Sequence, residues 1–220
     1  MSYNYTPFEY WYEHGKVYKK KFRYDKNFRL QEEFLIDYLN GITGSFKSVL
    51  ELGCGFGRIT KLLLTNYNNI TEYLAVDLSP HQIENAKNLL SSMKKLPDNE
   101  VKLDFMVSDI QSLNLDNKKY DLVILSEVLL HILPTDIDSI IKKLITLSKK
   151  HIINIDWYED ELPKKQTLHN FIHQYEAIYK KYTVPSTTIK RIPIKRKKFI
   201  GTLDTKQSIF HVIIEKNQPN

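Results

Sequence analysis

Hydrophobic residues along the chain follow two alternating spacings, one typical of helices and one typical of buried strands. Apolar residues recur at helical spacing from Phe28 to Leu39, and Gly41 then supplies a residue suited to ending a helix. The same spacing predicts further helices over 59–67, 80–93, 137–145 and 164–181. Short apolar runs predict strands over 47–52, 73–77, 101–107, 120–126, 151–155, 187–194 and 207–215.

Strand and helix alternate five times in this pattern, which predicts an α/β fold. Such alternation is typical of a doubly wound, mostly parallel sheet with helices on both faces. The run from Tyr120 to Ser126 is almost entirely apolar, as expected for a strand that is buried on both faces. Residues 1–27 are aromatic and basic with weak periodicity, and they predict one or two short helices.

The composition is that of a globular protein with one sizeable core. The chain has 220 residues, of which 42% are hydrophobic and 26% charged. Its first residues are polar and aromatic, so we expect no signal peptide, and no run approaches the ~20 apolar residues of a membrane span. Cys54 is the single cysteine, which excludes an internal disulfide or a cysteine zinc cluster. We therefore expect a cytoplasmic protein, monomeric or homodimeric.

The net charge of +6 is concentrated near the C-terminus. Positive and negative residues balance before residue 183, and the stretch from Lys190 to Lys198 holds six basic residues in nine. This segment could bind phosphates of RNA or an anionic glycan or lipid head group. Alternatively, it is an edge strand whose lysines discourage aggregation.

Three of the seven glycines, Gly53, Gly55 and Gly57, fall within five residues after the first predicted strand. Their spacing differs from the G-x-G-x-x-G fingerprint of dinucleotide-binding folds, because Arg58 stands where the third glycine belongs. Glu51 lies two residues before the first glycine, where a carboxylate would repel a pyrophosphate. The loop therefore favours a nucleoside that carries a positive charge and no phosphate.

Acidic residues also end the later strands, at Asp77, Asp109, Glu127 and Asp156. Ligands of parallel α/β sheets bind at the carboxyl ends of the strands. The segments ELGCGFG, AVDLS, Ser108-Asp109-Ile110 and YDLVILSEVLLHI, in this order and spacing, resemble the motifs of the class I S-adenosylmethionine-dependent methyltransferases. The resemblance covers about residues 45–157 and implies seven strands, with a methyltransferase domain over 28–216 and an aromatic, basic lid segment over 1–27.

The resemblance also implies which residues bind the cofactor, S-adenosylmethionine. Glu51 and the loop backbone would hold the methionine portion, Asp77 both ribose hydroxyls, and Asp109 the adenine amino group. The full implied set is Glu51, Gly53, Cys54, Gly55, Gly57, Asp77, Leu78, Asp109, Ile110 and Ser126. Structural alternatives stay open: Asp77 could cap the next helix, Asp109 could form a turn, and Cys54 could simply fill space. We expect Arg58 to face a helix or solvent.

Methyl transfer from a sulfonium is an in-line displacement, so alignment supplies much of the rate and a base is needed only when the acceptor loses a proton. Candidate bases are Glu127 and His131, four residues apart and therefore on one face of a helical turn, and Asp156. A packed histidine and a solvated turn aspartate are the plain alternatives. His169 and His173 share helical i, i+4 spacing but have no third ligand nearby in sequence, so we expect no metal.

The acceptor is less constrained than the cofactor. Ser126-Glu127-Val128-Leu129 replaces the Asn/Asp-Pro-Pro-aromatic tetrad typical of enzymes that methylate base amines, which argues against DNA. We expect a small-molecule, glycan or lipid-linked acceptor, with oxygen favoured. The alternatives are an RNA or protein methyltransferase that docks through 190–198, and a non-catalytic cofactor-binding subunit. An aromatic patch of Tyr10, Trp11, Tyr12 and His14 precedes the core, where it is either a lid over the sulfonium or a packed amphipathic helix.

Overall fold

The computed structural model describes residues 5–22, 25–42, 46–93, 101–161, 169–197 and 202–214. These residues fall into two compact units, Tyr5–Asn114 and Leu115–Asn220. Seven strands are present among them, three in the first unit and four in the second. Every described helix is too short or too polar to cross a membrane.

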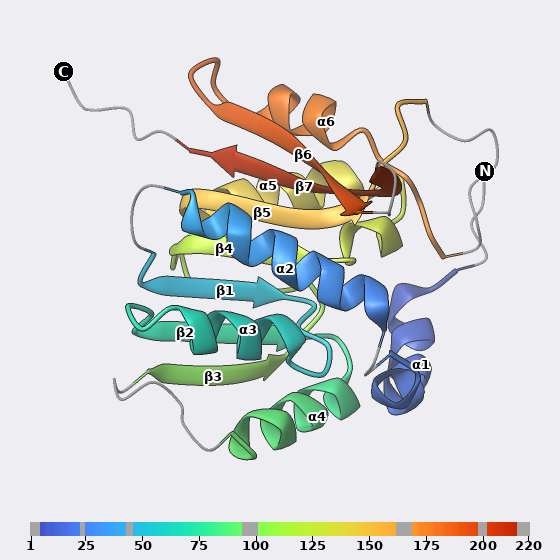
Figure 1. Cartoon of the computed structure of the whole chain (residues 1–220), viewed down its shortest axis with the longest axis vertical. Helices are drawn as coiled ribbons and strands as arrows, with labels where there is room; N and C mark the ends of the chain where they lie inside the picture. The colour runs from blue at the N-terminus through green and yellow to red at the C-terminus, as the bar shows by residue number, and fades with distance from the viewer. Residues whose placement is uncertain are drawn as a thin grey trace. The chain divides into compact units, whose positions relative to one another are not determined.

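The first unit holds a parallel three-stranded sheet with helices packed against it (Figure 1). Its strands are β1 (Ser48–Leu52), β2 (Glu72–Asp77) and β3 (Lys102–Val107), in the order β3-β2-β1. Its helices are α1 (Pro7–Phe22), α2 (Lys26–Asn40), α3 (Arg58–Asn66) and α4 (Pro80–Ser91). Every residue of β1 is buried, as its apolar run predicts. The pairing of Leu52 with Val76 and of Asp77 with Val107 brings the carboxyl ends of the three strands to one edge.

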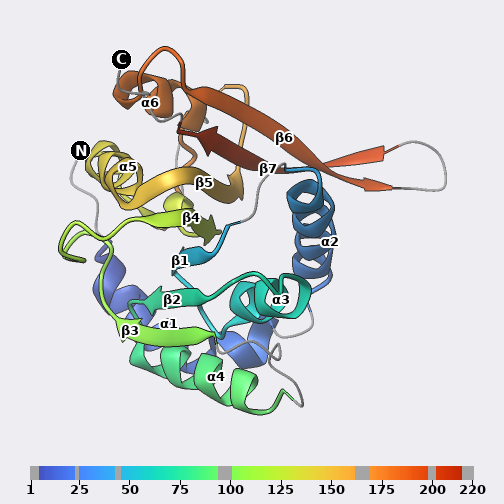
Figure 2. The same ribbon diagram turned by 90° about the vertical axis from the view of Figure 1, so that its left-hand side faces the viewer.

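The second unit holds four strands in the order β4-β5-β7-β6. They are β4 (Tyr120–Ser126), β5 (Ser148–Trp157), β6 (Thr188–Lys197) and β7 (Thr202–Ile213). Its helices are the short 3-10 helix η1 (Leu129–His131), α5 (Ile137–Leu147) and α6 (Tyr175–Tyr182). Helices α5 and α6 pack against each other and lie on the same side of β5 (Figure 2). The apolar face of α5, including Ile140, Ile141 and Leu144, is buried against the strands.

Strand pairing in the first unit is parallel, as expected of a mostly parallel sheet, whereas the second unit adds antiparallel pairs. β4 pairs in parallel with β5, but β7 runs antiparallel to both β5 and β6. The connection between β6 and β7 is only a few residues long, and a parallel pair would need a crossover of a dozen residues or more. Apolar runs predict where strands occur, but they do not specify the direction in which neighbouring strands pair.

The helix expected over 164–181 is corrected. Residues 164–168 lie outside the described residues, 169–174 are not helical, and α6 begins only at Tyr175. The backbone N–H of Phe171 donates to the carbonyl of Leu130 at 2.7 Å, and the ring of His173 bonds to the carbonyl of Ile132 at 3.0 Å. These tertiary hydrogen bonds hold the segment in a non-helical path and replace the helical ones.

Candidate functional site

The glycine loop after β1 has a backbone that only glycine adopts easily. Gly53, Gly55 and Gly57 have φ angles of 71°, 54° and 86°, all in the left-handed region. At Gly57 there is a second reason, because an added Cβ would lie 3.0 Å from the Cβ of Ala86 in α4. Gly57 therefore permits close packing of α3 on α4, whereas at Gly55 the nearest atom is the Nε2 of Gln82, 3.8 Å away.

Most of the loop's backbone donors are engaged within the protein. The N–H groups of Gly53 and Cys54 both donate to the carbonyl of Val76, at 2.8 and 3.0 Å. The N–H of Gly55 donates to Oδ2 of Asp77 at 2.8 Å. A phosphate needs free donors, whereas an ammonium or a sugar hydroxyl needs acceptors. The loop therefore suits a ligand that donates hydrogen bonds, in agreement with the absence of a phosphate predicted from the sequence.

Glu51 is the most enclosed acid of the first unit, with only 3% of its surface exposed. The hydroxyls of Thr60 and Tyr73 donate to its Oε2 at 2.5 and 2.6 Å. Burial raises the pKa of Glu51 to about 7, and the two hydroxyls and the nearby charge of Arg58 oppose this rise. A positively charged ligand group beside Glu51 would lower this pKa and ionise the carboxyl. Neither Thr60 nor Tyr73 stood out in the sequence, because nothing local links them to Glu51.

Asp77, at the end of β2, joins the glycine loop to the start of α4. Its Oδ2 accepts from Gly55 and its Oδ1 accepts from the N–H of Ser79 at 2.8 Å. Burial raises the pKa of Asp77 to about 6, although both N–H groups favour the charged form. The expected capping role is therefore present, and each carboxylate oxygen retains a lone pair for a further donor.

Asp109 lies just beyond β3. The N–H of Ser108 donates to the carbonyl of Asp77 at 3.0 Å, so the strand ladder continues almost to Asp109. The carboxylate of Asp109 accepts from the N–H of Gln111 at 3.1 Å, which is the predicted turn contact. Ile110 is buried and Leu78 is half-buried. The three acids predicted to bind the cofactor therefore lie at the carboxyl ends of three consecutive parallel strands.

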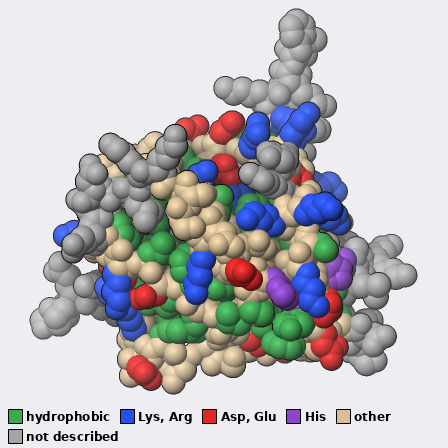
Figure 3. All heavy atoms as spheres, turned by 90° about the horizontal axis from the view of Figure 1, so that it is seen from below, with side chains coloured by type: hydrophobic (Ala, Val, Ile, Leu, Met, Phe, Trp, Pro, Cys, Tyr) green, Lys and Arg blue, Asp and Glu red, His purple; other side chains and the backbone are tan. Residues whose placement is uncertain are grey.

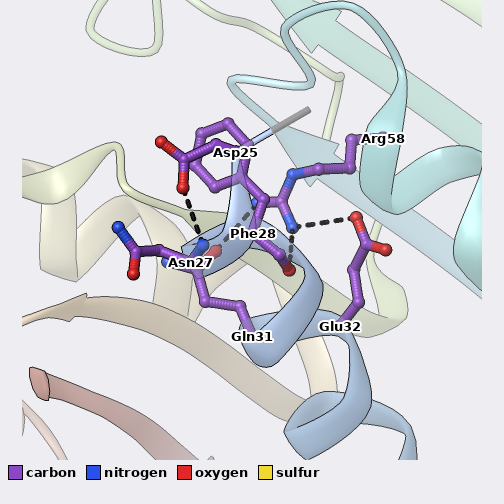
Figure 4. Close-up of polar contacts among 6 residues, drawn as sticks. All are labelled: Asp25, Asn27, Phe28, Gln31, Glu32 and Arg58. Atoms are coloured by element: carbon purple, nitrogen blue, oxygen red, sulfur yellow. Dashed lines mark hydrogen bonds and ion pairs between the residues drawn. The ribbon is translucent and has the colours of Figure 1, made fainter. Parts of the chain in front are cut away.

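Arg58, the first residue of α3, connects the glycine loop to α2 (Figure 4). Its guanidinium donates to Oε1 of Gln31 at 3.0 Å, pairs with Glu32 at 3.4 Å and stacks 4.2 Å from the ring of Phe28. In the same view, Asp25 accepts from the N–H of Asn27 and caps α2. The expectation that Arg58 faces a helix is confirmed. Its partners are 26 to 30 residues away in sequence, so no local signal could have identified them.

Helix α1 packs on the start of α4. A Cβ added at Gly15 would lie 2.8 Å from the Cβ of Ser79 and would clash with it. Helix α1 can approach α4 this closely because residue 15 has no side chain. Tyr12 lies 5.9 Å from His81, and Tyr18 lies 6.3 Å from Phe56 in the glycine loop. The aromatic patch also packs within itself, with Tyr10 stacked 3.8 Å from His14. This is the packed-helix alternative, and the lid role remains a prediction.

The remaining candidates belong to the second unit, and one expectation about them is wrong. Glu127 and His131 do not share a helical face, because η1 begins at Leu129 and Glu127 has a left-handed φ of 55°. The N–H of Glu127 donates to the carbonyl of Ile155 at 2.7 Å, which fixes this unusual backbone.

The side chain of Glu127 is held by β7, because its Oε1 accepts from Nε2 of Gln207 at 2.6 Å. Gln207, on β7, was not predicted, since 80 residues separate it from Glu127. Ser126 ends β4 and is half-buried.

His131 is a neutral histidine with a defined tautomer. Its Nδ1 lies 2.7 Å from the carbonyl oxygen of His169, and a carbonyl can only accept, so Nδ1 carries the proton. Burial lowers the pKa of His131 to about 4. The lone pair therefore resides on Nε2, which can accept a proton or a hydrogen bond.

Asp156 is fully buried within β5, which excludes the solvated-turn alternative. Its carboxyl accepts from the N–H of Leu130 at 3.3 Å and from the amide of Asn154 at 3.4 Å. Burial, with a further contribution from the negative charge of Glu127, raises the pKa of Asp156 well above its usual value. The protonated form of Asp156 is therefore favoured more than it would be in water. Among the described residues, no group of three or more His, Cys, Asp or Glu side chains is arranged to hold a metal ion.

Comparison with known proteins agrees with this geometry. Residues 49–151 match a family model described as a methyltransferase domain, and this range contains the glycine loop and all three acids. Residues 49–151 are therefore similar to a methyltransferase domain. Two curated methyltransferases match part of the chain. Malonyl-[acyl-carrier protein] O-methyltransferase of Acetivibrio thermocellus is 35% identical over 104 residues, which is 46% of this chain and 33% of that protein. The Anoxybacillus flavithermus protein of the same name is 32% identical over 101 residues, 46% of this chain and 35% of that protein. The chain thus matches about a third of the length of these relatives.

Solved methyltransferase structures share the fold over almost the whole chain. An S-adenosylmethionine-dependent methyltransferase from Leishmania major has a TM-score of 0.71 and 18% identity, with 94% of this chain and 81% of that chain covered. Magnesium protoporphyrin IX methyltransferase from Synechocystis PCC 6803, solved with S-adenosylmethionine bound, has a TM-score of 0.66 and 16% identity, with coverages of 98% and 100%. At identities of 16% and 18%, the similarity to these structures shows the fold alone.

Proposed function

We propose that this protein is an enzyme that binds S-adenosylmethionine and transfers its methyl group to a small-molecule, glycan or lipid-linked acceptor, with oxygen as the favoured atom. The observation that carries the proposal is the set of acids at the carboxyl ends of β1, β2 and β3, grouped with a left-handed glycine loop. The family match over residues 49–151 supports it.

The donor set fits the cofactor's chemistry. S-adenosylmethionine presents an ammonium, two ribose hydroxyls and an adenine amino group, all of which donate hydrogen bonds, and it supplies a methyl group already activated on a sulfonium. Glu51 would accept from the ammonium, Asp77 from the ribose and Asp109 from the amino group. The carboxylates also favour a ligand with positive charge, while the engaged N–H groups of Gly53, Cys54 and Gly55 disfavour a phosphate.

The second unit contains groups that can accept the acceptor's proton or hydrogen-bond to the acceptor. Nε2 of His131 bears a lone pair, and the carboxylate of Glu127 is oriented by Gln207. Asp156 is fully buried, and its carboxyl already accepts from the N–H of Leu130 and the amide of Asn154. We therefore propose His131 or Glu127 as the base and assign Asp156 a hydrogen-bonding role. The names of the two curated relatives, both O-methyltransferases, support oxygen as the acceptor atom.

An RNA or protein acceptor that docks through the basic segment is the alternative. Strand β6 carries most of this segment and lies at the end of its unit's sheet; Lys198 lies outside the described residues. Figure 3 draws a face on which basic, acidic and hydrophobic side chains are interspersed. Within the basic segment, Arg191 of β6 is already paired with Asp160 and Glu176, and this pairing favours the small acceptor.

Calorimetry with S-adenosylmethionine and its demethylated product tests cofactor binding, with Asp77→Asn and Asp109→Asn expected to weaken it by about tenfold or more each. Asp104→Asn, an exposed acid on β3, serves as a matched control. Failure of the wild-type protein to bind either compound would refute the proposal. Incubation with methyl-labelled cofactor and fractionated extract then identifies the acceptor. Label in the small-molecule or lipid fraction supports the proposal, whereas label in RNA or protein supports the alternative.

A further inference from the structure

We propose that a pocket in the second unit binds an anionic group of the acceptor, a carboxylate or a phosphate. This inference rests on the proposed methyltransferase function and names the class of substrate. The pocket has a volume of about 440 Å³, within the range of small-molecule sites. It lies just past the carboxyl end of β5, where ligands of such sheets bind. Its lining residues are Tyr158, Glu159, Asp160, Arg191, Lys195 and Ser208, with Glu161, Pro193 and Lys206 beside them.

The β6–β7 hairpin is shaped to present cations to this pocket. Its pairing shifts register between Ile194 and Lys195, and bulges of this kind redirect side chains, often beside active sites. Opposite the shift, the hydroxyl of Thr205 donates to the carbonyl of Ile194 at 2.5 Å, and Lys206 adopts a left-handed φ of 59°. A strained, non-glycine conformation persists only where its surroundings enforce it. The hairpin thereby supplies two lysines to one pocket.

Arg191 provides the planar cation that a carboxylate or a phosphate prefers. Its guanidinium stacks on the ring of Tyr158 at 4.0 Å, which fixes its orientation, and pairs with Glu176 at 3.4 Å. It also pairs with Asp160 at 3.4 Å, but the side chain of Asp160 is 86% exposed. Exposed pairs of this kind contribute little, so a ligand anion can displace Asp160 from Arg191.

Two further groups on the pocket wall can bind a ligand. Ser208 is only 3% exposed, yet its hydroxyl makes no hydrogen bond with the described part of the chain. Lys195 likewise forms no ion pair within the described ranges. By contrast, the acids Glu159 and Asp160 already neutralise Lys206 and Arg191. Glu161, the third acid of the lining, is exposed and forms no ion pair within the described ranges. A ligand anion would therefore lie against Arg191, Lys195 and Ser208, away from Glu161.

The test is a titration of the full-length, nitrogen-15-labelled protein with phenyl phosphate, with benzoate and with neutral benzamide, followed by NMR. We expect saturable amide shifts at Arg191, Lys195 and Ser208 with at least one anion and none with benzamide. The two anions distinguish phosphate from carboxylate recognition. Arg191→Met should weaken binding by about tenfold or more, because a charged hydrogen bond is lost. Arg196→Met removes the same charge from the same strand outside the pocket lining, and should change the affinity by less than about twofold.

Asp160→Asn tests the proposal in the opposite direction, because a folding defect could lower the anion affinity but could not raise it. Loss of the competing carboxylate should tighten anion binding by about threefold or more. The proposal is overturned if no anion saturates, if Arg191→Met and Arg196→Met weaken binding equally, or if Asp160→Asn fails to tighten it. Calorimetry with S-adenosylmethionine separates the two hypotheses. Cofactor binding without anion binding refutes the pocket alone, and anion binding without cofactor binding refutes the methyltransferase function.

Discussion

Glu51, a proposed binding residue, destabilises the ligand-free protein at neutral pH. Its pKa of about 7 in the folded chain exceeds the ordinary glutamate value, so the folded state binds more protons than the unfolded state between about pH 4.5 and 7. The associated stability is present at low pH and is lost as the pH rises through 7. A ligand ammonium would offset this cost by favouring the charged form.

Glu51→Gln should therefore stabilise the ligand-free protein at pH 8 by about 1–3 kcal/mol and leave its stability nearly unchanged at pH 4.5. Gln keeps an amide oxygen for the hydroxyls of Thr60 and Tyr73. Urea unfolding at the two pH values measures the difference. The same variant should lose about tenfold or more in cofactor affinity. A variant that is less stable than wild type at pH 8 would contradict this account.

Cofactor binding by the wild-type protein should weaken as the pH falls. Below pH 7 Glu51 is protonated in the free protein, and Asp77 follows near pH 6, so binding a cationic ligand must release protons. Calorimetry at pH 6 in two buffers of different ionisation enthalpy should show this release, and it should be reduced in Glu51→Gln. Equal apparent enthalpies in both buffers would show that neither acid changes its protonation on binding.

Gln207 is the residue that orients the proposed base Glu127. Gln207→Leu removes the donor 2.6 Å from Oε1, so we expect methyl transfer to slow by about tenfold and its pH dependence to shift upward, because the carboxylate loses a stabilising hydrogen bond. Cofactor affinity measured by calorimetry should not change. A loss of rate without any shift of the pH profile would indicate a structural role only.

At the scale of elements, the contact between α1 and the start of α4 depends on Gly15. Alanine is favoured over glycine by about 1 kcal/mol inside a helix, yet its Cβ would clash with Ser79. Gly15→Ala should therefore displace α1 and speed its hydrogen exchange by about tenfold. The double variant Gly15→Ala, Ser79→Gly removes the clash and should restore protection, since glycine is tolerated at an N-cap. Unchanged exchange in the single variant would show that α1 tolerates the added methyl.

The sequence predicts the elements well where one local pattern dominates. β1 and β4 are mainly apolar and almost entirely buried, and α2 ends before Gly41 as expected. Predictions fail where distant partners decide the outcome. The path of 169–174 depends on carbonyls of Leu130 and Ile132, and the left-handed Glu127 depends on Ile155 and Gln207. The three acids of the proposed cofactor site stand out in the sequence because each lies within two residues of the end of a strand, whereas Thr60, Tyr73 and Gln207 required the fold.

At the scale of the whole molecule, the excess positive charge must be reconciled with a small acceptor. All of the net charge of +6 arises after residue 182, but Arg191 and Lys206 are already paired with acids. Binding to RNA by phosphate contacts would require many unpaired cations and would show a steep salt dependence. The paired state of these residues favours local recognition of one anionic group over tracking along a polyanion.

Replacing Arg196, Lys197 and Lys198 together by glutamine distinguishes a small acceptor from RNA. The triple variant keeps Arg191 and Lys195 of the pocket. If the acceptor is small, label transfer to it should stay within about twofold of wild type, since Arg191 and Lys195, which line the pocket, are unchanged. If the acceptor is RNA, transfer should fall by about tenfold or more and become less sensitive to salt, because fewer counterions are released. Measuring label incorporation at two salt concentrations separates the outcomes, with cofactor affinity as the check that the variant folds. A tenfold loss of transfer together with a weaker salt dependence would therefore assign the basic strand to a polyanionic acceptor and remove the reason to seek a small one.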